Sequence, residues 1–157
     1  ERHVEYDRLN QFIHSIFASP ELYRLACTRP FDREAIDRVL DRRADPTCFV
    51  RFGRTALHAA LGVDPMGTRE PCQDLLEFLV ERKADVNSVD AAMMTALDYA
   101  AARQKTDMRF KDIAASLKKK GGKLFVDVAL EVEEKVNQAL RMALEPAFEI
   151  EKQALGR

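Results

Sequence analysis

Three histidines and three cysteines are the side chains of this sequence that could serve as nucleophiles, proton carriers or soft metal ligands. They occur without the Cys-x-x-Cys or His-x-x-x-His spacing that a zinc site uses. A cysteine nucleophile needs a neighbouring base and an electropositive, partly exposed setting, whereas Cys72 falls on the apolar side of a predicted helix. Phosphate-binding loops of the Gly-x-x-x-x-Gly-Lys-Ser/Thr type are also absent. The sequence therefore predicts no catalytic residue, no metal site and no cofactor. The residues considered are His3, His14, His58, Cys27, Cys48 and Cys72.

Composition narrows the class of protein further. The 157 residues are 46% apolar and 32% charged, which fits one compact domain with its own core. Lys and Arg number 25 against 26 Asp and Glu, so the net charge of −1 favours neither a nucleic acid nor a membrane as partner. No apolar run is long enough to span a bilayer. Three widely spaced cysteines are typical of reduced thiols, and we expect an intracellular, cytoplasmic protein.

The elements that must position any functional surface are helices. Apolar residues recur at helical spacing. The sequence has no sustained alternation of apolar and polar residues, which is the pattern that indicates a strand. Three segments carry the i, i+3, i+4, i+7 pattern of an apolar helix face or its equivalent. We therefore predict an all-α fold. The three apolar faces comprise Ala35, Ile36, Val39 and Leu40; Cys72, Leu75, Leu76 and Leu79; and Phe110, Ile113, Ala114 and Leu117.

The helical pattern repeats along the chain. Residues 82–87 read RKADVN and echo residues 42–47, which read RRADPT. A Thr-Ala-Leu follows each of these segments at the same distance, beginning at Thr55 and at Thr95. The period is about 40 residues, which is typical of repeat proteins whose units share one continuous core.

These segments resemble the ankyrin repeat, most closely in GRTALH at residues 53–58 and ADVN at residues 84–87. The resemblance implies an all-α solenoid of about three repeats within a single domain, residues 1–157. We assign residues 20–53 to a degenerate repeat, and 54–92 and 93–123 to repeats with inserted loops at 61–71 and 103–110. An N-terminal capping helix is predicted over residues 1–19. A long C-terminal capping helix and tail are predicted over 124–157, with Pro146 breaking the helix.

The resemblance also gives expectations for single residues. It implies that His58 hydrogen-bonds backbone in adjacent turns and ties repeats together. Arg43 and Lys83 stand where a glycine normally ends the second helix in a left-handed conformation, which costs another residue about 1 kcal/mol. Met93 stands at the glycine of a hairpin turn. We therefore expect these turns to be strained or built differently.

The resemblance implies a concave groove lined by hairpin fingers as the binding surface. The first finger carries two aromatic residues and two arginines, in the order Phe49, Arg51, Phe52 and Arg54, and both residue types are enriched at interface hot spots. We therefore predict a non-enzymatic interaction module whose protein partner offers an apolar anchor with some acidic character. Alternatives are a regulatory or targeting part of a larger enzyme, self-association through the C-terminal helix as a homodimer, and a rival surface on the inserted loops. The predicted contact residues are Phe49, Arg51, Phe52, Arg54, Ala91, Ala92, Met93, Met94 and Arg103.

Overall fold

In the computed structural model of the chain, residues 20–42, 44–63 and 70–155 are described. Over these ranges the secondary structure is α-helical apart from one 3-10 turn, and no strand occurs among them. The predicted all-α fold is therefore confirmed. The expected N-terminal capping helix, Arg43 and most of the inserted loop at 61–71 lie outside the described residues.

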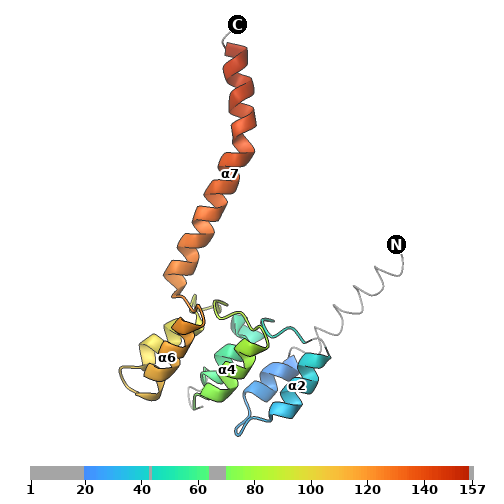
Figure 1. Cartoon of the computed structure of the whole chain (residues 1–157), viewed down its shortest axis with the longest axis vertical. Coiled ribbons are helices and arrows are strands. Elements are labelled where there is room, and N and C mark those ends of the chain that lie inside the picture. The colour runs from blue at the N-terminus through green and yellow to red at the C-terminus, as the bar shows by residue number, and fades with distance from the viewer. Residues whose placement is uncertain (1–19, 43, 64–69, 156–157) are drawn as a thin grey trace, which may run out of the picture. The chain divides into compact units, whose positions relative to one another are not determined.

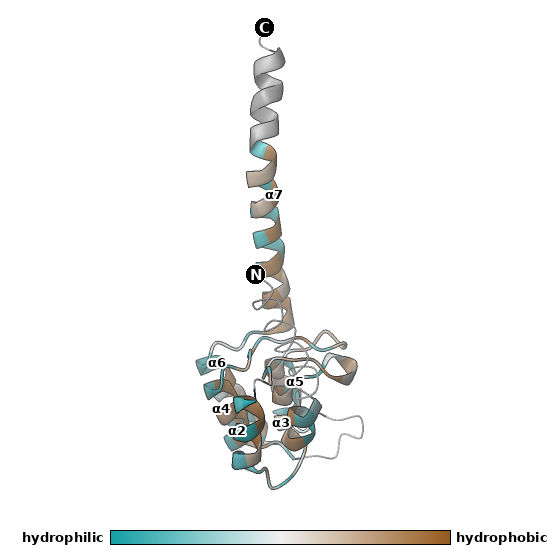
Figure 2. Ribbon diagram, turned by 90° about the vertical axis from the view of Figure 1, so that its right-hand side faces the viewer, coloured by the Kyte–Doolittle hydropathy of each residue, from teal (hydrophilic) through white to brown (hydrophobic). Residues whose placement is uncertain are grey.

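The helices come in pairs that stack. Residues 20–26 form a helix that precedes α2 (Arg33–Asp41). The next two pairs are α3 (Ala56–Ala60) with α4 (Gln73–Glu81), and α5 (Ala96–Arg103) with α6 (Arg109–Lys119). In Figure 1, α2, α4 and α6 stand in a row. Figure 2 looks along that row, and α3 and α5 form the second layer beside it.

One apolar cluster runs through all three helix pairs, as the helical spacing predicts. Each fully buried leucine or isoleucine stabilises the fold by roughly 1.5–3 kcal/mol relative to an exposed one. Because every pair contributes such residues, no pair has a core of its own, which is how a stacked repeat protein is stabilised. The large apolar side chains with less than 2% exposure are Leu22, Ile36, Leu57, Leu61, Leu75, Leu76, Leu79 and Leu117.

At the end of α4, Lys83 stands in the position where the ankyrin repeat normally has a glycine. Lys83 adopts the left-handed conformation, with φ 69°. Its N–H donates to the carbonyl of Val80 at 3.0 Å, and the next N–H, of Ala84, donates to Leu79 at 2.9 Å. Gly121 ends α6 in the same way, with φ 85°. The left-handed turn is therefore kept at Lys83, with the conformational free-energy cost expected for a residue that has a side chain.

The C-terminal helix, α7 (Phe125–Leu155), is longer than expected. It continues through Pro146, so the predicted break at this residue is wrong. Proline removes one backbone hydrogen bond and crowds the preceding turn, but a helix of 31 residues has many other bonds on both sides of that point. The role of this helix as a cap stays a prediction.

The chain divides into two compact units, residues 1–125 and residues 126–157. The first holds the stacked pairs, and the second is almost entirely α7. None of the described helices combines the length and the apolar character that a membrane crossing requires.

Candidate partner-binding surface

Two hairpin fingers connect successive helix pairs, and both have the same backbone hydrogen bonds. In the first, Val50 N–H donates to the Arg54 carbonyl at 2.8 Å, and Gly53 N–H donates to Val50 at 3.0 Å. In the second, Asp90 N–H donates to Met94 at 3.1 Å, and Met93 N–H donates to Asp90 at 3.0 Å. The two fingers are therefore equivalent turns, one repeat apart.

A direct hydrogen bond holds the fingers together. Ala91 N–H in the second finger donates to the Phe52 carbonyl in the first at 2.9 Å. The backbone approaches so closely that a Cβ on Gly53 would lie 2.9 Å from the Ala91 nitrogen. Gly53 also has φ 67°, so glycine is required there for two reasons. The fingers consequently form one continuous surface rather than two independent loops.

Met93 occupies the position that glycine has in the first finger. It adopts φ 59°, in the left-handed region that glycine prefers. The turn geometry that the sequence placed in doubt is therefore retained, and the methionine side chain carries the strain.

We expect Met93→Gly to raise the free energy of unfolding by about 1 kcal/mol, because glycine has no Cβ penalty at positive φ. The exposed Met93 side chain contributes little packing that the change would remove. Urea unfolding followed by circular dichroism measures the effect. Ala92→Gly is the control, since Ala92 precedes Met93 but has no positive φ. An equal or larger gain for Ala92→Gly would contradict the strain at Met93.

Large apolar side chains are exposed on both fingers. Phe49 is 57% exposed, Phe52 50% and Met93 60%. Ala91 and Ala92 are exposed beside them. Both phenylalanines of the first finger are therefore accessible. The side chain of Arg51 lies outside the described part of the chain.

Two of the predicted contact arginines point inward instead. The Arg54 side chain is only 16% exposed, and its Nε lies 4.0 Å from Asp90 Oδ2. The Arg103 Nη1 lies 3.4 Å from the carbonyl oxygen of Leu61 and 3.5 Å from that of Gly62, just after α3. Met94 is half-buried. These three residues connect repeats, and a role for them in binding stays a prediction.

A second arginine approaches α3 from the other side. The Arg29 Nη2 donates to the carbonyls of Ala59 and Ala60 at 3.2 and 3.3 Å. Arg29 belongs to the first repeat and Arg103 to the third, so the C-terminal end of α3 lies between cations from both neighbours. A positive charge is favourable there because the helix dipole makes that end negative.

His58 has the role that the resemblance implies. Its side chain is completely buried. Nδ1 accepts from the Thr55 N–H at 3.2 Å, so Nε2 is assigned the proton that it donates to the Met94 carbonyl at 3.3 Å. Burial lowers the pKa of His58, because a charged imidazolium would lose its hydration. The histidine therefore joins the second repeat to the finger of the third.

Asp98 occupies the equivalent position in the third repeat. Its Oδ2 accepts from the Thr95 N–H at 2.9 Å and from the Phe125 N–H at 2.8 Å. His58 donates to the next segment, whereas Asp98 accepts from it. Phe125 is the first residue of α7, and a carboxylate is favourable at a helix N-terminus. The sequence showed the change from His to Asp, but the partner of Asp98 was not anticipated.

Asp90 is the polar residue on which the second finger depends, and the sequence analysis missed it. Oδ1 accepts from the N–H groups of Ala92 and Met94 at 2.9 and 3.2 Å. Oδ2 accepts from the Tyr99 hydroxyl at 2.6 Å. Burial and this hydrogen bond raise the pKa of Tyr99 to about 12. An aspartate that is followed by its own turn is the signal that could have identified it.

Paired helices in two layers, joined by equivalent hairpins and by hydrogen bonds passed from one repeat to the next, define a helical-repeat protein. The chain contains an ankyrin repeat: the family model described as "Ankyrin repeat" matches residues 52–91. That range begins in the first finger and ends in the second. No curated protein matches the chain.

An ankyrin repeat supports a protein–protein interaction module in general, and domains of this kind are typically non-catalytic. Within the described residues, no group of three or more His, Cys, Asp or Glu side chains could hold a metal ion. The alternative that the chain is the regulatory part of a larger enzyme stays a prediction.

Proposed function

We propose that the chain binds a segment of a partner protein at its two fingers, with Phe49, Phe52 and Met93 as the apolar contacts. The observation that carries this proposal is the exposure of all three side chains on neighbouring turns. If these side chains were buried, the fingers would serve only to connect the repeats. The backbone bond between Ala91 and Phe52 supports the proposal, because prearranged contacts lose less conformational entropy on binding.

The contacts favour a mainly apolar ligand. Asp90 faces the Arg54 guanidinium, so the positive charge of Arg54 is largely balanced within the protein. Arg54 also lies over the Phe52 ring, 5.8 Å from its centroid, which helps to hold the aromatic side chain. The sequence of this finger contains one further arginine, Arg51, and we propose it as the cation that meets an acidic group. We propose a short peptide with a large apolar anchor and an acidic neighbour.

A random peptide library displayed on phage tests this surface. Peptides selected on the whole chain should carry aromatic or aliphatic residues beside Asp or Glu. Phe52→Asn should weaken binding of the selected peptides at least about ten-fold, because it removes an anchor side chain. Asparagine tolerates the φ of 66° at this position, so the turn is retained.

Met108→Ala is the matched control for the peptide experiment. Met108 is as large and as exposed as the finger residues but precedes α6, outside the fingers. Its replacement should leave peptide binding unchanged. Enrichment of no peptide family, or equal losses for Phe52→Asn and Met108→Ala, would contradict binding at the fingers.

We also propose that α7 associates with other copies of the chain. Seven of its large apolar side chains are between 49% and 68% exposed. All but Met142 lie on one side of the helix, and a face of this extent normally marks an interface. A helix of 31 residues is about 45 Å long, enough for a stable helical bundle. The seven are Val126, Leu130, Val132, Val136, Leu140, Met142 and Leu144.

A further inference from the structure

The apolar face of α7 consists of two different rows of side chains. The small row is made of alanines and valines, and the leucine row lies beside it. At 3.6 residues per turn the centres of the rows are about 100° apart. The small row comprises Ala129, Val132, Val136, Ala139 and Ala143. The leucine row comprises Val126, Leu130, Leu140 and Leu144, with Glu133 and Asn137 in its middle.

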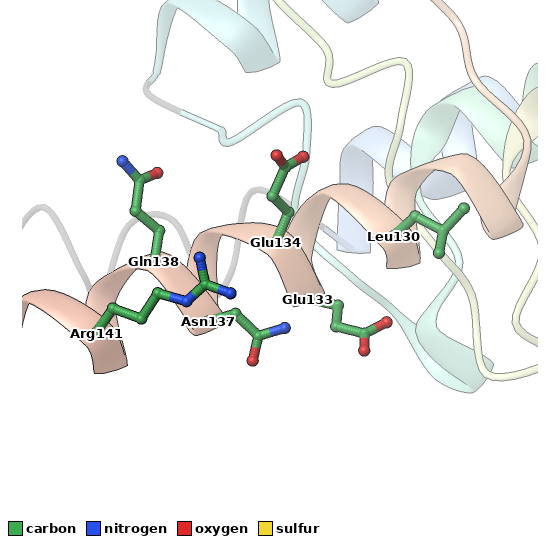
Figure 3. Close-up of a pocket in the computed structure, with 6 residues that line it drawn as sticks. All are labelled: Leu130, Glu133, Glu134, Asn137, Gln138 and Arg141. Carbon is green, nitrogen blue, oxygen red and sulfur yellow. The ribbon is translucent and has the colours of Figure 1, made fainter.

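The leucine row is open to contact. Leu130, Leu140 and Leu144 are all about half exposed. Figure 3 shows Leu130, Glu133 and Asn137 along this helix, among the residues that line a hollow on its surface. Every residue lining that hollow comes from α7, so the hollow lies on the surface of this one helix.

The two rows match each other in size and in spacing. Each leucine directly follows an alanine of the small row, in the pairs 129/130, 139/140 and 143/144. The gaps between pairs are ten and four residues, in the same order in both rows. If two copies of α7 lie parallel and in register, each leucine of one copy meets an alanine of the next. An antiparallel copy reverses the order of the gaps and cannot align all three pairs.

One pair of charges at the outer margins of the two rows agrees with this register. Glu134 lies at the outer margin of the leucine row, and Lys135 lies at the outer margin of the small row. In a parallel arrangement they come to nearly the same height on neighbouring helices, with opposite charges. Such pairs beside an apolar seam help to set the orientation of associating helices.

We infer that α7 forms a closed parallel ring of more than two copies, in which the leucine row of each copy packs on the small row of the next. The inference rests on the proposed self-association of α7. A two-fold dimer uses the same patch on both copies, whereas contact between two different patches continues until a ring closes. Rows about 100° apart fit a square of four helices best.

Sedimentation equilibrium of the whole chain tests this assembly. The expected mass is four times the chain mass of 17.9 kDa. Leu140→Ala should weaken assembly at least about ten-fold, because it leaves a cavity over the facing alanine. Met142→Ala is the control and should leave the mass unchanged, since Met142 is also exposed but lies outside both rows.

Charge reversal tests the register separately. Glu134→Lys and Lys135→Glu should each weaken assembly, and the double variant should restore it because the opposite charges are again adjacent. A mass of three or four chains together with this rescue supports the ring. A dimer overturns the ring but leaves self-association standing, whereas a monomer at every concentration overturns both. Absence of rescue overturns the parallel register.

Discussion

Asp90→Ala should destabilise the protein by about 3–5 kcal/mol, the largest loss that we expect from a single substitution. The change removes the acceptor of two backbone N–H groups and of the Tyr99 hydroxyl. It also leaves the Arg54 guanidinium, which is mostly buried, without the carboxylate that faces it. A buried charge that loses its counter-charge is costly because water cannot replace it. Urea unfolding of the whole chain measures the loss.

Two further variants separate the contributions at Asp90. Asp90→Asn keeps an oxygen acceptor but loses the charge, so its cost should be intermediate. Asp85→Ala is the control: Asp85 also accepts a bond from a nearby backbone N–H, that of Asn87, but it is exposed. Its cost should stay below about 1 kcal/mol. Equal costs for Asp85→Ala and Asp90→Ala would show that the buried network adds nothing.

The second large effect is a loss of stability in mild acid. The pKa of His58 is lowered in the folded protein, so the unfolded chain takes up the proton at a higher pH than the folded one. The contribution of His58 is therefore complete well above the ordinary value of 6.5 and is lost as the pH falls through and below it. Each pH unit in this window costs up to about 1.4 kcal/mol. Urea unfolding at about pH 7.5 and pH 5.5 reveals the change.

His58→Gln should remove this part of the pH dependence, because glutamine does not titrate in the window. It should also cost about 1–3 kcal/mol at neutral pH through poorer hydrogen bonds to Thr55 and Met94. His3→Gln with His14→Gln is the control and should keep the pH dependence of the unsubstituted chain. The same dependence in His58→Gln would mean that other groups cause it.

The periodic features of the fold could be predicted from the sequence. The helix faces around Leu75 and Ile113 are buried because a period of 3.6 residues places them on one side. The positions of the turns at Lys83 and Met93 followed from where glycine is expected, but the sequence left open whether they are strained or built differently, and the structure shows the left-handed conformation. His58 followed from the resemblance. For the helix faces and the turns the cause is local, since it depends on neighbours within one or two helical turns, whereas the partner of His58 lies 36 residues away and came from the resemblance alone.

Contacts between distant residues could not be predicted in the same way. Arg54 and Arg103 have the residue type of an interface anchor, and only the structure shows that both are engaged within the stack. Arg29 lies 30 residues before the carbonyl of Ala59 that it contacts. A sequence shows which residues are cationic, but not which helix end lacks partners. The predicted break at Pro146 was wrong for another reason. The local rule that proline ends a helix was outweighed by the length of the helix around it.

The substitution of Asp98 for the histidine seen at position 58 limits how far the array can grow. A histidine at this place offers a proton to the carbonyl of a following hairpin, as His58 does to Met94. The carboxylate of Asp98 can only receive one, and it does so from the amide of Phe125. A further hairpin grafted after residue 123 would meet an oxygen where it requires a donor. The bonding of Asp98 therefore suits a following helix N-terminus and not a following hairpin.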